Sequence, residues 1–193
     1  MEDGSAAYVR ARAELSCVVD LERACGGFVN CELSRKPKAP LVIRLQKPPS
    51  VVKLQENGLL SFAGRGSVGE ARLALKRVAR RCQRAGLACV KFKRFQVLQL
   101  TQDRRLAFAV NLLQLGRCPG AEDSLNAATP RVRISCCRAS DGSGPSIEPP
   151  GVQVDVFAQG RLRLTGARSA EELRLAMEYL EPMLAKCKAG VGA

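Results

Sequence analysis

The sequence predicts an α+β fold made of two copies of one structural unit. Three observations lead to this prediction: a repeated segment, a pair of helix-start motifs, and strands that alternate between apolar and polar residues. The repeated segment occupies residues 57–64 and 159–166, and its first glycines, Gly58 and Gly160, are 102 positions apart (160 minus 58). Such a duplication within one chain predicts two similar halves that are related by a pseudo-two-fold arrangement.

Each copy is followed by a Ser-x-x-Glu motif, Ser67 with Glu70 and Ser169 with Glu172. In such a capping box the serine oxygen accepts from the third helical N–H, and the glutamate accepts from the N–H of the serine. The motifs therefore predict helices over residues 68–85 and 170–187. Pro182 lies inside the second helix and is expected to kink it or remove one backbone hydrogen bond.

The first of these helices is predicted to bury one side against a sheet. Its apolar stripe is expected to contain Leu73, Leu75, Val78 and Cys82. Its exposed side is expected to carry basic residues, namely Arg72, Lys76, Arg77, Arg80, Arg81 and Arg84.

Several short segments alternate strictly between apolar and polar positions. Val152, Val154 and Val156 alternate with Gln153, Asp155 and Phe157, and the same pattern occurs at 52–55, 60–63 and 161–165. Alternation of this kind predicts antiparallel strands with one covered face. Further strands near 8–17 and 95–102, each followed by a short helix near 19–29 or 106–115, complete the order strand, helix, strands, helix in both halves. We place the first repeat at 1–93 and the second at 94–193, with a hairpin-like loop insertion at 138–150.

Composition limits the possible functions. The chain has 193 residues, of which 46% are hydrophobic and only 4% aromatic, so the core must be aliphatic. A net charge of +13 indicates a polyanionic partner, most often nucleic acid, although basic surface can also serve solubility. Nine cysteines without a C-x-x-C pair, and the absence of histidine, argue against a metal site, a cofactor or an enzyme and favour a reducing compartment. No apolar run is long enough for a membrane span or a signal core, so a soluble intracellular protein is expected, with no membrane partner.

The second half resembles the TATA-box-binding protein family. Residues 156–168, Val-Phe-Ala-Gln-Gly-Arg-Leu-Arg-Leu-Thr-Gly-Ala-Arg, are similar to the family's strand-turn-strand motif, and residues 178–184 continue the likeness, including Pro182. Before residue 152 the matching positions include Asp20, Leu21, Arg44, Gly58, Gly64, Ser67, Phe92, Phe95 and Phe108. The resemblance covers nearly the whole chain and is strongest after residue 152.

The resemblance implies a saddle, formed by a curved ten-stranded antiparallel sheet with helices on its convex side. In the family the concave face lies in the DNA minor groove, and two pairs of phenylalanines wedge between base steps and kink the duplex, by about 80° in a well-known case. Of the four wedge positions only Phe157 is retained here. The others hold Gln55, Lys38 and, near the insertion, about Thr129.

Other positions of the concave face are charged or polar in this chain. The family's central asparagines are replaced by Tyr8 and Gln99, and positions that are apolar in the family hold Arg10, Lys53, Thr101, Asp155 and Arg163. The resemblance thus implies a DNA-binding face comprising Phe157, Thr165, Gln99, Tyr8, Lys53, Gln55, Arg163, Arg44, Arg161 and Arg168. Because unstacking costs a few kcal/mol per step, one phenylalanine is not expected to maintain two kinks.

Three functions remain open from the sequence. The first is a factor for promoter recognition and pre-initiation complex assembly in the nucleus, which binds promoter DNA weakly or atypically and is recruited by other promoter-binding subunits. The second is a saddle-shaped adaptor that binds proteins and not DNA, and the third is an RNA-binding sheet module. By resemblance, partners of the transcription factor IIA and IIB type would dock on a surface that includes Arg72, Arg77, Arg84, Glu122 and Asp123.

Overall fold

The α+β prediction is confirmed: the described residues form a ten-stranded antiparallel sheet with four helices. The computed structural model describes residues 7–87, 90–118, 120–124, 128–137, 145, 147 and 151–189. The predicted insertion at 138–150 lies outside the described residues except for Pro145 and Ile147.

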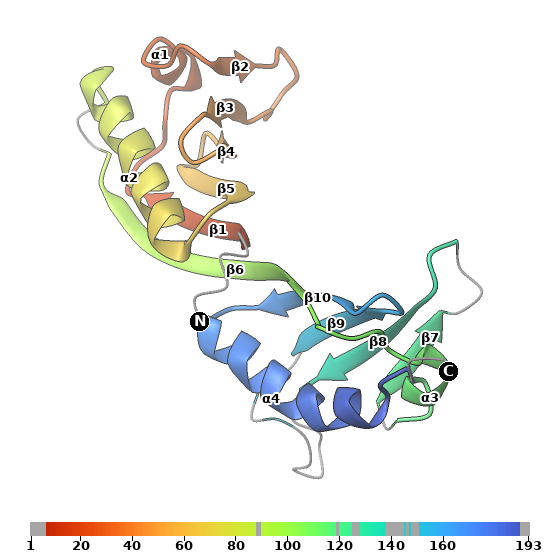
Figure 1. Cartoon of the computed structure of the whole chain (residues 1–193). Coiled ribbons are helices and arrows are strands. Elements are labelled where there is room, and N and C mark those ends of the chain that lie inside the picture. Colours follow the sequence, from red (N-terminus) through yellow and green to blue (C-terminus); the bar gives the residue numbers. More distant parts are fainter. Residues whose placement is uncertain are drawn as a thin grey trace. The chain divides into compact units, whose positions relative to one another are not determined.

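The same order of elements occurs twice along the chain (Figure 1). The first set is β1 (Tyr8–Leu15), α1 (Leu21–Cys25), β2 (Cys31–Leu33), β3 (Leu41–Leu45), β4 (Ser50–Leu54), β5 (Leu59–Arg65) and α2 (Val68–Arg84). The second set is β6 (Phe92–Arg105), α3 (Leu112–Leu115), β7 (Ala121–Ser124), β8 (Arg131–Cys136), β9 (Val152–Phe157), β10 (Arg161–Ala167) and α4 (Ala170–Lys186). The strands are hydrogen-bonded in the order β2-β3-β4-β5-β1-β6-β10-β9-β8-β7.

Backbone contacts divide the chain into two compact units. The described residues up to Gln99 form the first unit, and those from Leu100 onward form the second. The strand β6 runs from one unit into the other, so its first part pairs with β1 and its last part with β10. The repeat boundary predicted between residues 93 and 94 falls inside β6 and stays a prediction about the sequence repeat.

Helices cover one face of the strands in each unit. In the first unit α2 packs on β1 and β5, and in the second unit α4 packs on β9 and β10 while α3 packs on β8. The covered faces carry the apolar members of the predicted alternations, among them Val52, Leu54, Leu60, Phe62, Val152, Val154, Val156, Leu162 and Leu164, all of which are buried. The core is therefore mainly aliphatic, and none of the described helices covers the opposite strand faces.

The apolar stripe of α2 differs from the prediction at one position. Leu75, Val78 and Cys82 are buried, but Leu73 is 54% exposed. At about 100° per residue, Leu73 lies about 200° around the helix from Leu75, so the two cannot face the same sheet. Ala71 and Ala74 occupy the buried side in its place.

The two helix starts are similar but not identical. At α2 the capping box is complete: Ser67 Oγ accepts from Glu70 N at 3.1 Å, and Glu70 Oε2 accepts from Ser67 N at 2.7 Å. At α4 Ser169 Oγ accepts from Glu172 N at 3.2 Å, but Glu172 Oε2 accepts from the N–H of Arg168, one residue before the cap. The capping box predicted at α4 is therefore only half correct: the serine accepts as expected, but the glutamate does not accept from the N–H of Ser169.

Candidate nucleic-acid interface

The open strand face of the first unit carries basic side chains that are separated by small residues. In the cross-strand register Arg12 lies opposite Ser61, which lies opposite Lys53, and Arg10 lies opposite Ala63. Because serine and alanine leave space between the longer side chains, the surface is hollowed into a groove of about 370 Å³. We call this surface the first open face, and it is formed by Arg10, Arg12, Val42, Arg44, Val51, Lys53, Ser61, Ala63 and Leu98.

The cations of the first open face retain their charge. Arg10 Nη1 donates to the side-chain oxygen of Gln99 at 3.4 Å, and Arg12 Nε donates to that of Gln96 at 3.0 Å. An amide orients a guanidinium without neutralising it. Among the described residues, no carboxylate lies within ion-pair distance of Lys53, Arg10 or Arg12. The face is therefore positive over the strands β1 and β4.

Arg44, at the far side of this face, has an acidic neighbour. Its Nη2 lies 3.6 Å from Glu32 Oε2, and the two side chains are 65% and 71% exposed. Exposed pairs of this kind are worth about 0–1 kcal/mol because water screens them. Arg44 therefore remains available to an anion that binds here.

The open strand face of the second unit has a different charge pattern. Five residues on five neighbouring strands lie directly opposite one another in register: Glu122 on β7, Arg133 on β8, Asp155 on β9, Arg163 on β10 and Asp103 on β6. Their charges alternate in sign from strand to strand. Opposite charges that face each other across strands attract, whereas like charges repel. We call these five residues the charge row.

Two-point ion pairs hold the charge row together. Arg133 donates to Asp155 from Nε at 2.8 Å and from Nη2 at 3.3 Å, and Arg163 donates to Asp103 at 2.9 and 3.3 Å. The hydrogen bonds from Arg163, followed by the charges of Arg163 and Arg161, lower the pKa of Asp103 below its usual value. The pair with Asp155 likewise raises the pKa of Arg133. Both arginines of the row are thus neutralised by carboxylates.

Arginines on either side of the charge row share the same acids. Arg131 Nε lies 3.6 Å from Asp155 Oδ1, and Arg161 Nη2 lies 3.4 Å from Asp103 Oδ2. Asp155 therefore serves two arginines, with its side chain only 13% exposed. Asp103 and Asp155 therefore each reduce the positive potential of two arginines.

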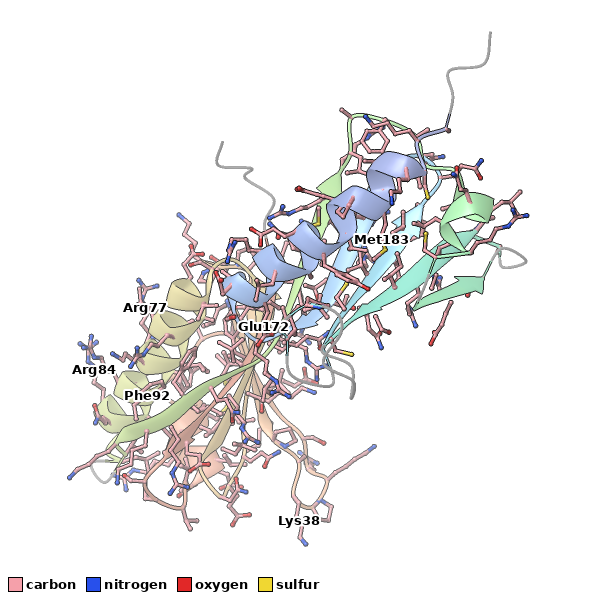
Figure 2. All side chains as sticks on the ribbon, turned by 90° about the horizontal axis from the view of Figure 1, so that it is seen from below. Lys38, Arg77, Arg84, Phe92, Glu172 and Met183 are labelled. Atoms are coloured by element: carbon pink, nitrogen blue, oxygen red, sulfur yellow. The ribbon has the colours of Figure 1, made fainter. Side chains whose placement is uncertain are left out.

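The four wedge positions lie at equivalent places in the two units. Phe157 is the last residue of β9, and Gln55 directly follows β4, the strand of the first unit at the same place in the order of elements. Lys38 lies in the loop between β2 and β3 (Figure 2), and Thr129 lies in the loop between β7 and β8. Lys38, Gln55 and Thr129 are exposed. The Phe157 ring is half-buried, with the Arg161 guanidinium 5.6 Å from its centroid.

The remaining predicted DNA-binding residues are distributed over both units. Tyr8 is 41% exposed at the start of β1, opposite Arg65. Thr165 lies on the open face of β10, where its hydroxyl donates to the Gln153 carbonyl at 3.4 Å. Arg168 lies beyond the end of β10, directly before the cap of α4, and so is not part of the open strand face.

Sequence reasoning missed four charged residues of these faces: Arg12, Arg131, Arg133 and Asp103. The alternation along β1 and β8 contains a signal for the three arginines, because each lies two residues from another outward-facing basic residue. No comparable signal exists for Asp103. Its role depends on the register between β6 and β10, which the sequence does not display.

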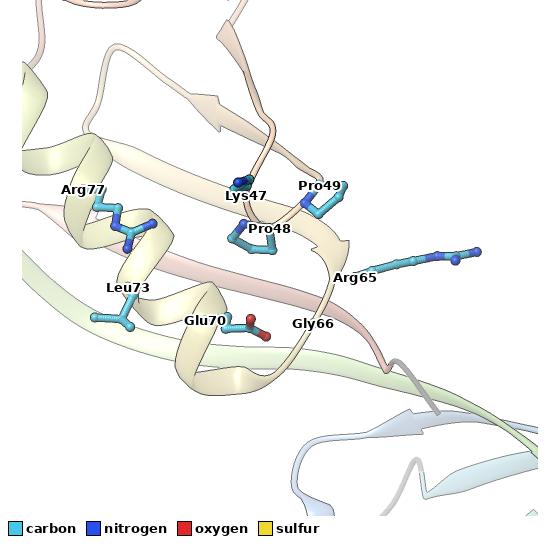
Figure 3. A pocket seen from close by; sticks show the side chains of 8 residues that line it. All are labelled: Lys47, Pro48, Pro49, Arg65, Gly66, Glu70, Leu73 and Arg77. Atoms are coloured by element: carbon cyan, nitrogen blue, oxygen red, sulfur yellow. The ribbon is translucent and has the colours of Figure 1, made fainter. Parts of the chain in front are cut away.

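One of the predicted protein-docking residues on α2 contacts a strand: the Arg72 guanidinium lies 5.7 Å from the centroid of the Phe95 ring on β6. Arg72, Arg77 and Arg84 are exposed, and Figure 2 shows Arg77 and Arg84 projecting from the helix. Next to them is a hollow of about 530 Å³ between the turn Lys47–Pro49 and the helix, where Pro48 and the exposed Leu73 lie close to Arg77 (Figure 3). Glu122 belongs instead to the charge row, and Asp123 pairs through its backbone with Val132.

The chain is similar to TATA-box-binding proteins both in sequence and in structure. Residues over 90% of this chain are 25% identical to the TATA-box-binding protein-like 1 of Entamoeba histolytica, of which they cover 76%. The TATA-box-binding protein of Saccharomyces cerevisiae is also 25% identical, over 91% of this chain and 69% of its own length. In structure, the Methanococcus jannaschii TBP matches 94% of this chain and 98% of its own with a TM-score of 0.76 at 20% identity, which shows a shared fold.

These similarities support a divergent member of the TATA-box-binding protein family. A further relative, the TATA box-binding protein-like 2 of Rattus norvegicus, is 26% identical, and this chain spans about half (49%) of its length. No protein-family model matches the chain. Within the described residues, His, Cys, Asp and Glu nowhere gather into a group of three that could hold a metal ion. The helices of the described part are all too short or too polar to cross a membrane.

Proposed function

We propose that this family member is a nuclear transcription initiation factor that contacts promoter DNA by charge and does not kink it as its relatives are expected to do. One observation carries the proposal: strand positions of the first open face hold cations without a carboxylate partner among the described residues, and the resemblance implies apolar groups at two of them, Arg10 and Lys53. Lysine and arginine side chains bind phosphates and give affinity that depends on salt and little on sequence.

The loss of wedges supports the same conclusion. Wedging residues must offset an unstacking cost of a few kcal/mol per base step. Gln55, Lys38 and Thr129 are polar or charged, and an inserted polar group would lose its hydration without gaining a partner. The remaining Phe157 ring lies under Arg161.

A bending measurement tests this proposal directly. A short duplex with a central TATA element carries a donor dye at one end and an acceptor dye at the other, and anisotropy reports binding in the same sample. We expect binding at low salt that disappears as salt rises, without the increase in energy transfer that a kink would cause. The Saccharomyces cerevisiae relative provides the positive control. Full kinking of the TATA duplex by this chain alone would refute the proposal.

A second candidate function is a protein adaptor in transcription. The hollow between the turn Lys47–Pro49 and α2 favours it, because exposed Leu73 offers an apolar contact beside the cations Arg65 and Arg77. Partners of the IIA and IIB type are proposed to dock on this side, together with other promoter-binding subunits. Pull-down with purified factors, compared between the native chain and Leu73→Asp, would measure whether this surface is used.

A further inference from the structure

We propose that the charge row masks the open strand face of the second unit, which we call the second open face, from nucleic acid, so that duplex DNA is held by the first open face alone. This inference rests on the proposed DNA-binding function and assigns it to one unit. The observation behind it is an asymmetry between two units that share the same order of elements. Arg10, Arg12 and Lys53 of the first unit have no carboxylate partner among the described residues, whereas arginines of the charge row and beside it are paired with Asp103 or Asp155.

The masking follows from the geometry of the acids. Asp103 and Asp155 each accept two hydrogen bonds from one arginine and lie within 3.6 Å of a second. A phosphate that approached these arginines would have to displace a carboxylate that is already bound in two-point geometry. It would also face the negative charge of that carboxylate at short range.

The first open face has no such obstacle. The partners of Arg10 and Arg12 are amide oxygens of Gln99 and Gln96, which a phosphate can replace without meeting a negative charge. Lys53 on β4 lines the groove together with Arg10 and Val51. Because each cation that neutralises a phosphate releases about 0.9 counterion on duplex DNA, these three residues make a measurable contribution to the salt dependence of binding.

Duplex DNA is the partner that the charges favour. The first open face has cations on β1 and β4, and the small residues Ser61 and Ala63 of β5 lie between them in the groove. That pattern suits a repeated anion such as a phosphate backbone, whose charge is distributed along its length. The competing basic surface is the exposed side of α2, so the experiment must separate these two surfaces.

The test compares four proteins by titrating a duplex of fixed length at several salt concentrations. The first variant is Arg10→Gln/Arg12→Gln/Lys53→Gln, and its matched control, Arg77→Gln/Arg80→Gln/Arg84→Gln, removes the same number of charges from α2. The second variant is Arg133→Gln/Arg163→Gln on the second open face. The fourth protein is the native chain, and circular dichroism confirms that each variant is folded.

The variants are expected to change the salt dependence of DNA binding by different amounts. The first variant should flatten the slope of log K against log salt by up to about 2.7 and weaken binding about tenfold or more at low salt. The α2 control and Arg133→Gln/Arg163→Gln should change the slope by less than about 0.5. Equal losses for the first variant and the α2 control, or a loss of slope in Arg133→Gln/Arg163→Gln, would overturn the assignment.

A gain-of-binding variant tests the mask itself. Asp103→Asn/Asp155→Asn keeps the size of both side chains and removes both negative charges, so the four neighbouring arginines become available. We expect a slope steeper by about 1–2 and tighter binding of the duplex. An unchanged slope would show that the carboxylates do not mask this face and would overturn the inference.

Failure of the proposed function is distinguishable from failure of this inference. If the native chain binds no duplex at any salt, the proposed DNA contact fails. A gain of binding in Asp103→Asn/Asp155→Asn would then still support the mask, whereas no gain would overturn the mask as well. Tighter binding of single-stranded RNA than of duplex DNA by the native chain would contradict the choice of partner.

Discussion

At the scale of single residues, Asp103 makes the stability of the fold depend on pH. Its pKa is lowered from 3.8, chiefly by the hydrogen bonds from Arg163. A carboxyl group whose pKa is lower in the folded state stabilises the fold above its unfolded pKa and loses that contribution as pH falls through the folded value. The stabilisation by Asp103 is therefore complete above about pH 5 and is lost in more acidic solution.

Urea unfolding of the native chain and of Asp103→Asn, measured between about pH 6 and pH 3, checks this expectation. The native chain should be more stable at pH 6, and the difference should shrink as the pH falls below 4. A difference that stays constant with pH would show that the charge of Asp103 contributes nothing to stability.

Gly160 is the residue on which the turn between β9 and β10 depends. Its φ is +78°, and a Cβ added there would lie 2.3 Å from the Phe108 carbonyl oxygen. Gly120 has a similar φ of +73°, but a Cβ there would meet nothing within 4 Å. Alanine substitutions at Gly160 and Gly120 therefore separate the free-energy cost of the backbone conformation from the cost of the steric contact.

We expect Gly120→Ala to cost about 1–2 kcal/mol of unfolding free energy, the usual cost of the left-handed conformation. Gly160→Ala should cost more, because the backbone around Phe108 must also move. Thermal and urea denaturation of both variants measure the difference. Equal costs would mean that the turn relaxes freely and that the contact is unimportant.

At the scale of elements, α2 shows which inferences from sequence succeed. The helix begins and ends within one residue of the prediction, because Ser67 and Glu70 specify its start through short-range hydrogen bonds. The assignment of Leu73 to the buried stripe failed, because alanines at the buried positions carry a weaker hydrophobic signal than an exposed leucine. Small residues allow α2 to approach β1 and β5 closely, which sequence hydrophobicity does not reveal.

This correction predicts different effects for two leucines on one helix. Leu75→Ala should cost about 2–5 kcal/mol of unfolding free energy, because it removes a fully buried side chain. Leu73→Ala should stay within about 0.5 kcal/mol, as expected for an exposed position. Urea denaturation of the two variants provides the measurement. A large loss of stability in Leu73→Ala would restore the original assignment.

In the strands, the sequence predicted which residues are buried but not which residues pair across strands. Alternation predicted correctly which residues of β4, β5, β9 and β10 are buried, because that property depends on each strand alone. The charge row depends on pairing between strands that are far apart in sequence, such as Asp103 with Arg163. A shift of register by one residue would move a whole set of side chains to the other face, so these partners became known only from the structure.

At the scale of the whole molecule, the net charge of +13 predicted a polyanionic partner but not where it would bind. The structure divides the cations of the strands into those held by amides, such as Arg12, and those held by carboxylates, such as Arg133. The formal charge counts both groups equally. An approaching polyanion responds to the local potential, which is reduced wherever a carboxylate already occupies the guanidinium.

The last prediction concerns the choice of DNA sequence by the intact chain. Phosphate contacts position a protein on DNA, whereas base contacts and sequence-dependent deformation provide specificity. Since the wedge positions at Gln55, Lys38 and Thr129 hold polar residues, we expect little sequence specificity from deformation of the DNA. We expect the dissociation constants for a TATA duplex and a GC-rich duplex to differ by less than about tenfold, which corresponds to about 1.4 kcal/mol.

Anisotropy titrations with two duplexes of equal length, at equal salt, provide the measurement, because the phosphate contribution is then the same for both. Lys53→Gln serves as the internal control: it should weaken binding of both duplexes by the same factor, since a phosphate contact does not depend on the base sequence. Specific DNA-binding proteins prefer their sites by about 10³-fold or more. A preference of that size for the TATA duplex would mean that side chains other than the missing phenylalanines read its sequence, and it would contradict binding by charge alone.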